Sequence, residues 1–402
     1  MNKFVLSINA GSSSLKFQLI LMPDECCIMS GLFEGKRTAL TKFKVNTRQN
    51  HKFEVNGGWD FSAAVDFLMQ YLKEEKIIQS VDEIYCVGHR VAHGGEEYSQ
   101  PVMITEQVKN SILSLSKLAP IHNPINLLCI EAFEDRLPGV PQVAVFDTAF
   151  HQTLPQEQYL YPLPYTLYEE YGIRKFGFHG TSHQYVNSVV AKQCSPIESK
   201  RIISCHLGSG ASICAIEDGK SVATTMGYTP LAGLMMGTRC GDIDPSLPLY
   251  LAQNTPMSIN DVSNMMNNAS GLLGVSELSD DCRVLQRASE QGDERAALAL
   301  RMFANKVKET IGRYCSVLDG LDTLVFTGGI GENSAYIRQQ VLDSLSYLGI
   351  RYCEASNEQN HSVLSQPDSQ IKVLIVNTDE ELMIARETVR VLTHQSEPNN
   401  SN

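Results

Sequence analysis

The chain has 402 residues, of which 43% are apolar and 19% are charged, and its formal net charge is −12. This length exceeds what one small core requires and predicts two domains. The negative charge argues against a broad nucleic-acid surface, so a bound anion would need cations placed locally. No apolar run approaches the ~20 residues of a membrane span, and polar residues 9–14 break the first apolar run too early for a signal peptide.

The predicted elements begin with two strands, residues 4–8 and 16–20, which a Gly/Ser turn joins. The same order of strand, Gly/Ser turn and strand returns at 202–216 and suggests two domains of like topology. Strands are also predicted at 84–87, 143–146, 323–326 and 373–376. Apolar stripes mark helices near 61–72, 303–318, 337–348 and 380–392, with Asn123 and Ser334 as expected helix caps. The alternation predicts largely parallel sheets covered by helices, an α/β fold.

Polar clusters are expected just past the ends of the predicted strands: Asn9, His89–Arg90, Asp147, His206 and residues 328–333. In open α/β sheets, ligands bind at the carboxyl ends of the strands. This shared placement indicates a ligand site more strongly than any single motif does. The eleven cysteines are scattered without a C-x-x-C pair, which argues against a disulfide framework and predicts a reducing cytoplasm.

Three glycine-rich turns could contact a nucleotide. "NAGSSSLK" (9–16) and "HLGSG" (206–210) offer main-chain N–H groups and hydroxyls that suit phosphate, although each alone could be a plain hairpin turn. Their matching positions in two repeats favour a nucleotide held between two domains. "TGGIGEN" (327–333) is not a dinucleotide fingerprint, because Ser334 stands where a glycine is needed. Its glycines still admit a base or ribose close to the main chain, and a plain helix start is the alternative.

Two histidine pairs have the four-residue spacing of some zinc sites. In "GHRVAHGGE", Arg90 stands where a zinc protease needs glutamate, and two glycines shorten any helix. In "FGFHGTSH", His179 is expected to precede a helix that contains His183. We therefore interpret His89, His93 and His183 as structural. The planar guanidinium groups of Arg90 and Arg239 can bind carboxylate or phosphoryl oxygens in pairs. Solvation at the surface is the alternative for both arginines, and Asp147 could simply cap a turn.

The blocks "INAGSSSLKF", "GHRVAHGGE", "APIHNP", "VFDTAFHQT", "FGFHGTSH", "HLGSGASI", "GLMMGTRCGDIDP", "FTGGIGENS" and "DEELMIARE" together resemble the acetate kinase family, in that family's order. The resemblance implies two ribonuclease-H-like domains of the acetate and sugar kinase, Hsp70 and actin superfamily, with an interdomain nucleotide cleft. The expected domains are 1–149 plus 381–402, and 150–380. It also implies a cytoplasmic homodimer that uses ATP with Mg²⁺, or Mn²⁺ as the alternative ion.

The same resemblance assigns roles to individual residues. Asn9 and Glu380 match metal-site positions, and Arg90 matches the carboxylate-binding arginine. Asp147, His179 and Arg239 match catalytic positions. The matched nucleotide-contacting residues are Lys16, His206, Leu207, Gly208, Ser209, Gly210, Asp281, Cys282, Arg283, Gly329, Ile330, Gly331, Glu332 and Asn333. Ser209 departs from a common asparagine. Ala92 stands where many acetate kinases carry valine and propionate-preferring relatives carry alanine.

The implied reaction is reversible, direct in-line transfer of a phosphoryl group from ATP to acetate, which gives acetyl phosphate and ADP. Because acetate is already an anion, we expect Asp147 to orient Arg90 or Arg239 and not to remove a proton. Propionate kinase is the alternative, since Ala92 leaves room for one more carbon in the acyl pocket, and a butyrate kinase would share the chemistry. An Hsp70- or actin-like ATPase and a zinc hydrolase built on the histidine pairs are the other rival interpretations.

Overall fold

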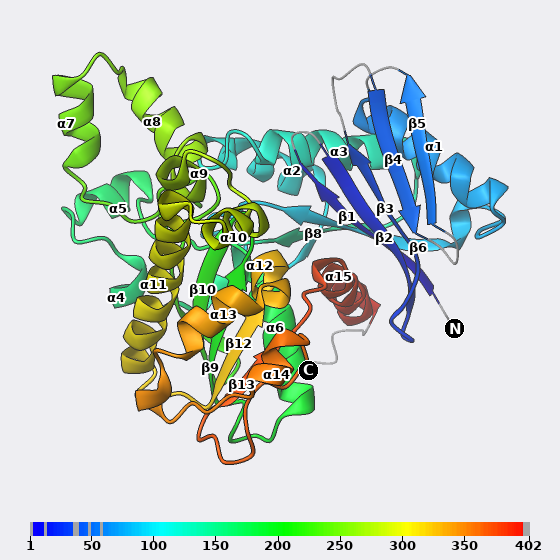
Figure 1. Cartoon of the computed structure of the whole chain (residues 1–402). Coiled ribbons are helices and arrows are strands. Elements are labelled where there is room, and N and C mark those ends of the chain that lie inside the picture. The colour runs from blue at the N-terminus through cyan, green and yellow to red at the C-terminus, as the bar shows by residue number, and fades with distance from the viewer. Residues whose placement is uncertain (1–2, 12–13, 35–39, 47–49, 57–58, 397–402) are drawn as a thin grey trace, which may run out of the picture. The chain divides into compact units, whose positions relative to one another are not determined.

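The structure is a computed structural model that describes residues 3–11, 14–34, 40–46, 50–56 and 59–396 (Figure 1). The chain divides into two compact units: unit 1 comprises residues 1–149 and 379–402, and unit 2 comprises residues 150–378. The second division falls two residues before the expected one. Asp379 and Glu380 therefore belong to unit 1, together with the helix that Glu380 begins.

Unit 1 is built on an eight-stranded sheet of order β5-β4-β3-β2-β1-β6-β8-β7. The strands β1, β6 and β8 are parallel, and β1 to β5 form an antiparallel meander. The short β7 pairs antiparallel with β8. Their bounds are β1 Lys3–Ala10, β2 Ser14–Met22, β3 Cys26–Glu34, β4 Leu40–Asn46, β5 Asn50–Asn56, β6 Ile84–Val91, β7 Val102–Met103 and β8 Gln142–Phe146.

The two faces of this sheet are covered by different helices (Figure 1). Leu6 and Ile8 of β1 pack with α1 (Phe61–Glu74) and α3 (Asn123–Arg136). Val5, which points the other way because side chains alternate along a strand, packs with α15 (Glu380–Ser396). The helix α2 (Glu106–Ser114) packs against α3. The last helix of the chain thus completes the unit that the first strands begin.

Unit 2 repeats the central part of this topology in a five-stranded sheet of order β11-β10-β9-β12-β13. The strands β11, β10 and β9 are antiparallel, whereas β9, β12 and β13 are parallel. This is the arrangement of β3-β2-β1-β6-β8, so the predicted pair of ribonuclease-H-like domains is confirmed. The bounds are β9 Arg201–Leu207, β10 Ala211–Glu217, β11 Lys220–Thr224, β12 Thr323–Thr327 and β13 Lys372–Ile375.

Helices also cover both faces of the second sheet. Val186 and Val190 of α6 pack on one face, and Phe303, Val307 and Ile311 of α11 pack on the other. The helices of unit 2 are α4 Gln156–Tyr159, α5 Thr166–Tyr171, α6 Gly180–Gln193, α7 Leu247–Asn254, α8 Ile259–Asn268, α9 Gly271–Ser276, α10 Cys282–Glu290, α11 Glu294–Val317, α12 Gly328–Asn333, α13 Ala335–Leu342 and α14 Glu354–Glu358. Among the described residues, no helix is long and apolar enough to cross a membrane.

Several expected boundaries were wrong. The strands β1 and β6 are longer than predicted, so Asn9 and Arg90 are the next-to-last residues of these strands and do not follow them. Asn123 does not cap α3; it is the first helical residue, and its side-chain oxygen instead accepts a hydrogen bond from the main chain of His93. Ser334 does cap α13, accepting from Ile337 N at 3.3 Å, but that helix ends at Leu342.

Candidate active site

In unit 1, one face of the sheet gathers the predicted metal and phosphate residues. Ser7 Oγ donates to the Glu381 carbonyl at 2.7 Å, so α15 begins over the face that carries Ser7. Asn9 lies two residues further along the same face. Lys16 is directly opposite Asn9 in the β1–β2 register, and its Nζ lies 2.9 Å from Glu381 Oε2. Ser12 and Ser13 of the first turn lie outside the described residues.

Arg90 reaches the same face from β6. A Cβ at Gly88, two residues earlier, would overlap Thr388 and Ile384, so this glycine allows α15 to pack closely. Arg90 Nη2 donates to Asp147 Oδ2 at 2.9 Å, with side chains 19% and 1% exposed. Burial opposes the charge of Arg90, but the neighbouring Asp147 outweighs it and raises the pKa of the guanidinium. Arg90 Nε is buried without a hydrogen-bond partner among the described residues and could donate to a bound anion.

Glu380, the first residue of α15, has a strongly shifted pKa. Burial, followed by the nearby Asp147 carboxylate, raises the pKa of Glu380 to about 7, and Arg90 and Lys16 offset this only in part. A divalent cation would relieve that crowding of negative charge. The amide of Asn9 and the carboxylate of Glu380 are oxygen ligands of the kind that Mg²⁺ prefers, with waters and phosphates completing the shell. The donor set therefore fits Mg²⁺.

Two asparagines that the sequence analysis did not assign to the site support it. Asn126 Oδ1 accepts from Ala92 N at 3.0 Å, and Asn126 Nδ2 donates to the Ala10 carbonyl at 3.0 Å. Its amide therefore ties together the ends of β1 and β6. Asn123, one helical turn earlier, bonds both the N–H and the carbonyl of His93. The N-P-x-N spacing of "HNPIN" was the available signal, since residues three apart share a helix face. Ala92 itself is 3% exposed.

In unit 2, His179 and Arg239 flank the glycine turn between β9 and β10. His179 lies just before α6 in a left-handed conformation, φ 57°, and its ring stacks on His206 with centroids 4.3 Å apart. A Cβ built on Gly210 would lie 3.5 Å from both Arg239 Nη1 and His179 Nε2. The guanidinium and the imidazole therefore converge on one point of this turn.

Arg239 is a half-buried cation without a carboxylate partner among the described residues. Its Nη1 donates to the Pro230 carbonyl at 3.2 Å and contacts the Met236 sulfur. Burial lowers the pKa of the guanidinium. The loop that carries Arg239 is held to the glycine turn between β9 and β10 by the Gly237 N–H, which donates to the Ser209 carbonyl at 3.1 Å. A desolvated cation without a counter-ion is suited to bind an anion.

A pocket of about 760 Å³ in unit 2 collects most of the predicted nucleotide residues. Glycine turns form one wall, and the start of α10 forms another. Cys282 lies in this second wall, and Arg283 donates to the Asp281 carboxylate through its main-chain N, Nε and Nη2. The pocket is lined by Gly208, Ser209, Asp280, Asp281, Cys282, Arg283, Gln286, Gly329, Ile330, Asn333, Ser334, Ala335 and Tyr336. Its volume suits a nucleoside. The sequence analysis did not assign Gln286 and Tyr336 to the nucleotide site, because these two residues come together only in the folded chain.

The other nucleotide predictions do not line this pocket. Leu207 and Gly331 are buried, and the Leu207 side chain belongs to the core. Glu332 acts as an internal brace: its Oε1 accepts from Gly328 N at 2.9 Å and from Thr378 N at 3.0 Å. His206 Nδ1 lies 2.7 Å from Ser182 Oγ, which also bonds Thr378.

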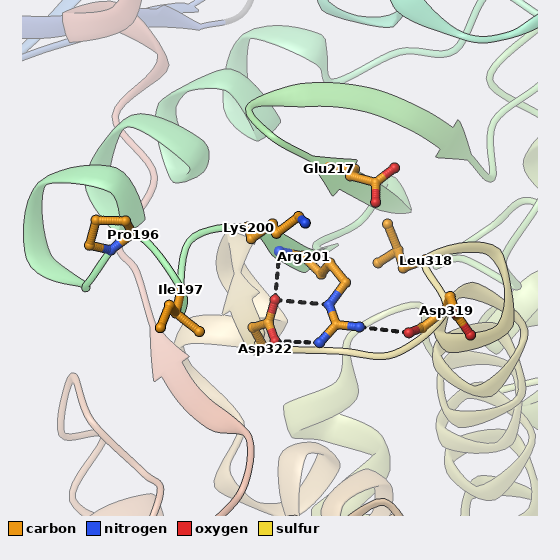
Figure 2. A pocket seen from close by; sticks show the side chains of 8 residues that line it. All are labelled: Pro196, Ile197, Lys200, Arg201, Glu217, Leu318, Asp319 and Asp322. Atoms are coloured by element: carbon orange, nitrogen blue, oxygen red, sulfur yellow. Dashed lines mark hydrogen bonds and ion pairs between the residues drawn. The ribbon is translucent and has the colours of Figure 1, made fainter.

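A second hollow of unit 2, about 470 Å³, lies at the opposite end of the strands (Figure 2). Arg201, the first residue of β9, is held there by Asp322 through Nε at 3.0 Å and Nη2 at 2.7 Å, and it also donates to the Asp319 carbonyl. Its hydrogen bonds join the β9 start to the loop before β12. We therefore interpret Arg201 as structural.

The histidine pairs have structural hydrogen bonds. His89 Nε2 lies 2.6 Å from Gln142 Oε1, and burial lowers the pKa of His89 to about 4. His183 is bonded through both ring nitrogens, to Ser204 and to Ser212. Within the described part of the chain, no three His, Cys, Asp or Glu side chains are grouped to hold a metal.

Comparison with known proteins agrees with this chemistry. The model of the acetokinase family matches residues 4–386. An acetate kinase of Geobacillus kaustophilus is 50% identical over 392 residues, which cover 96% of this chain and 98% of that protein. A propionate kinase of Citrobacter rodentium is 48% identical over 392 residues, 97% of each chain. The crystal structure of Porphyromonas gingivalis acetate kinase matches with a TM-score of 0.92 and 40% identity, covering 97% of this chain and 100% of that one. The chain therefore belongs to the acetokinase family.

Proposed function

We propose that the protein is an acetate kinase, which transfers the γ-phosphoryl group of ATP to acetate and gives acetyl phosphate and ADP. The observation that carries this proposal is the supply of cations. Arg90 is oriented by Asp147 and keeps a buried, unpaired Nε, and Arg239 has no carboxylate partner among the described residues. Two anionic reactants can approach each other only where such positive charge is placed in advance.

The residues divide the work by their chemistry. Arg90 binds the carboxylate of acetate, and Asp147 fixes the position of the guanidinium. Arg239 and His179 donate to the oxygens of the transferring phosphoryl group, on which charge is spread in the transition state. A carboxylate oxygen forms a bond to the γ-phosphorus while the bond to the bridging oxygen breaks, and ADP leaves with that electron pair. No proton has to be removed from acetate, so a general base is not required.

Asn9 and Glu380 would hold Mg²⁺, which when bound neutralises part of the phosphate charge. The pocket that Gly208, Arg283 and Gly329 line would take the nucleoside. Lys16 adds a cation to the first phosphate loop. Burial opposes its charge, but Glu381 and then Glu380 outweigh burial and raise the pKa of Lys16, so it stays protonated.

Propionate kinase is the second candidate because of Ala92. A methyl side chain at this buried position, beside the carboxylate-binding Arg90, leaves more room than valine for an acyl chain. One methylene changes preference by only about 1–3 kcal/mol, so the two acids would overlap as substrates.

Trapping the acyl phosphate with hydroxylamine tests the proposal. Purified protein with Mg-ATP is assayed with acetate, propionate and butyrate, and without any acid. We expect hydroxamate only with an acid, most with acetate, and loss of activity with EDTA but not with a zinc-selective chelator. ATP hydrolysis that is independent of the acid would identify an ATPase instead, and greater kcat/KM with propionate would favour the second candidate.

We also propose that the protein is a cytoplasmic homodimer. All eleven cysteines are free, which is typical of a reducing compartment. Exposed apolar side chains gather on α7 and α8 of unit 2: Leu249, Tyr250 and Ile259 are 58%, 60% and 61% exposed. Such a patch is typical of a self-association surface. Light scattering should give twice the monomer mass for the wild type, and the Leu249→Glu variant should have the mass of one monomer.

A further inference from the structure

A buried histidine and two buried serines form a hydrogen-bonded network that ends at His179. Ser204 Oγ lies 2.9 Å from His183 Nδ1, His183 Nε2 lies 2.8 Å from Ser212 Oγ, and Ser212 Oγ lies 3.0 Å from His179 Nδ1. Ser204, His183 and Ser212 are all 0% exposed. The network therefore runs from the buried core to the part-buried imidazole beside Arg239.

The hydrogens of this network have two arrangements in which Ser212 uses its own hydrogen and all three hydrogen bonds are made. Burial, with His151 and the other nearby histidines, holds the pKa of His183 well below 6.5, so its ring carries one hydrogen. The Ser212 hydroxyl also has one hydrogen, and it can be given either to His183 or to His179. If Ser212 donates to His179 Nδ1, then His183 donates to Ser212 and Ser204 donates to His183. In the reverse arrangement, every one of these bonds changes direction.

Ser204 distinguishes the two arrangements. Among the described residues, His183 is the only side-chain or main-chain partner of its hydroxyl. In the first arrangement the hydroxyl hydrogen is used. In the reverse arrangement Ser204 accepts from His183, and its own hydrogen is left without an acceptor in a fully buried position. An unsatisfied buried donor is strongly unfavourable, so the first arrangement is preferred.

We propose that Ser204, His183 and Ser212 are positioning residues that fix neutral His179 as the tautomer with its hydrogen on Nε2. His179 Nε2 faces Gly210 together with Arg239 Nη1. The neutral ring therefore presents an N–H donor toward the position where, according to the proposed function, the phosphoryl oxygens bind. The opposite tautomer would present a lone pair to an anion and repel it.

Nitrogen-15 NMR of the imidazoles in the whole protein tests this directly. With ¹⁵N-histidine labelling, the long-range ¹H–¹⁵N pattern identifies the tautomer, and the His179 signals are assigned by their loss in His179→Gln. We expect the neutral His179 ring of the wild type to be the Nε2–H tautomer. In Ser204→Ala and Ser212→Ala, the Nδ1–H tautomer should become detectable. The measurement needs no substrate, so failure of the acetate kinase proposal would leave it intact.

Kinetics supply the second readout. Loss of the preference should lower kcat by about 3- to 10-fold, the equivalent of one hydrogen bond, with KM for acid and ATP within about 2-fold. Ser221→Ala is the matched control, because Ser221 is a buried serine that bonds a different buried histidine, His151, and is not part of this hydrogen-bonded network. This substitution should leave the His179 tautomer and kcat unchanged. An Nδ1–H tautomer in the wild type overturns the proposal, and that measurement stands even if a variant fails to fold. Serine variants that match Ser221→Ala in tautomer and kcat overturn it as well.

Discussion

If Asp147 acts through Arg90, the effects of removing the two side chains cannot be additive. The pair is joined at 2.9 Å with Asp147 1% exposed, and breaking a buried pair costs about 3–5 kcal/mol. Because Arg90 is 19% exposed, we expect a coupling of about 2–3 kcal/mol, or ~30- to 150-fold in kcat/KM for acetate. Asp147→Ala should be severely impaired alone. In an Arg90→Ala background, the same substitution should cost almost nothing more.

The assay is hydroxamate formation at varied acetate with Mg-ATP in excess, for the wild type, both single variants and the double variant. Asp66→Ala is the matched control, since Asp66 forms a two-bond pair with Arg136 in the same unit but is exposed. It should leave kcat/KM unchanged. Strictly additive losses at Asp147 and Arg90 would refute the orienting role and point to an independent function of Asp147, such as proton transfer.

Three further outcomes are expected. Arg239→Ala should lower kcat by ~10³-fold with little change in the acetate KM, and Arg239→Lys should recover little of it, because a point charge does not replace a planar fork; steady-state kinetics decide. Ala92→Val should shift the acetate-to-propionate ratio of kcat/KM toward acetate by ~10-fold; an unchanged ratio would remove Ala92 from the acyl pocket. Since the pKa of His89 is about 4 in the folded state and 6.5 ordinarily, the unfolded state binds more protons between these values. From His89 alone, the free energy of unfolding should therefore fall by about 2 kcal/mol as the pH is lowered from 7 to 5. Urea titrations should show a smaller fall in His89→Gln than in His361→Gln, which replaces an exposed histidine.

Local sequence patterns predicted the repeated core of the fold. The two predicted strand–turn–strand units at 4–20 and 202–216, each with glycine and serine in the turn, correspond to β1–β2 and β9–β10. Apolar periodicity also located α1 and α11. The strands β3, β4, β5, β7 and β11 were not predicted, because their pairing with neighbouring strands, and not their local pattern, defines them.

The candidate site was predicted best where one residue carries a charge. Arg90 with Asp147, and Arg239 with His179, are brought together within their units. Residues that act through neutral hydrogen bonds were not found, since Ser204, Ser212 and Asn126 are ordinary in sequence. Their hydrogen-bond partners are separated from them by 21 to 116 residues along the chain, and only the tertiary structure brings them within bonding range.

The return of α15 to the first sheet has a consequence for biosynthesis. Chains emerge from the ribosome N-terminus first, and domains usually fold as they emerge. Here the sheet made from the first 149 residues must wait, with Val5, Ile20 and Cys86 uncovered, until residues 380–396 have been made. The carboxylate of Glu380 arrives with that closing helix, so a nascent chain would acquire its proposed metal ligand and the cover of its apolar face in one event.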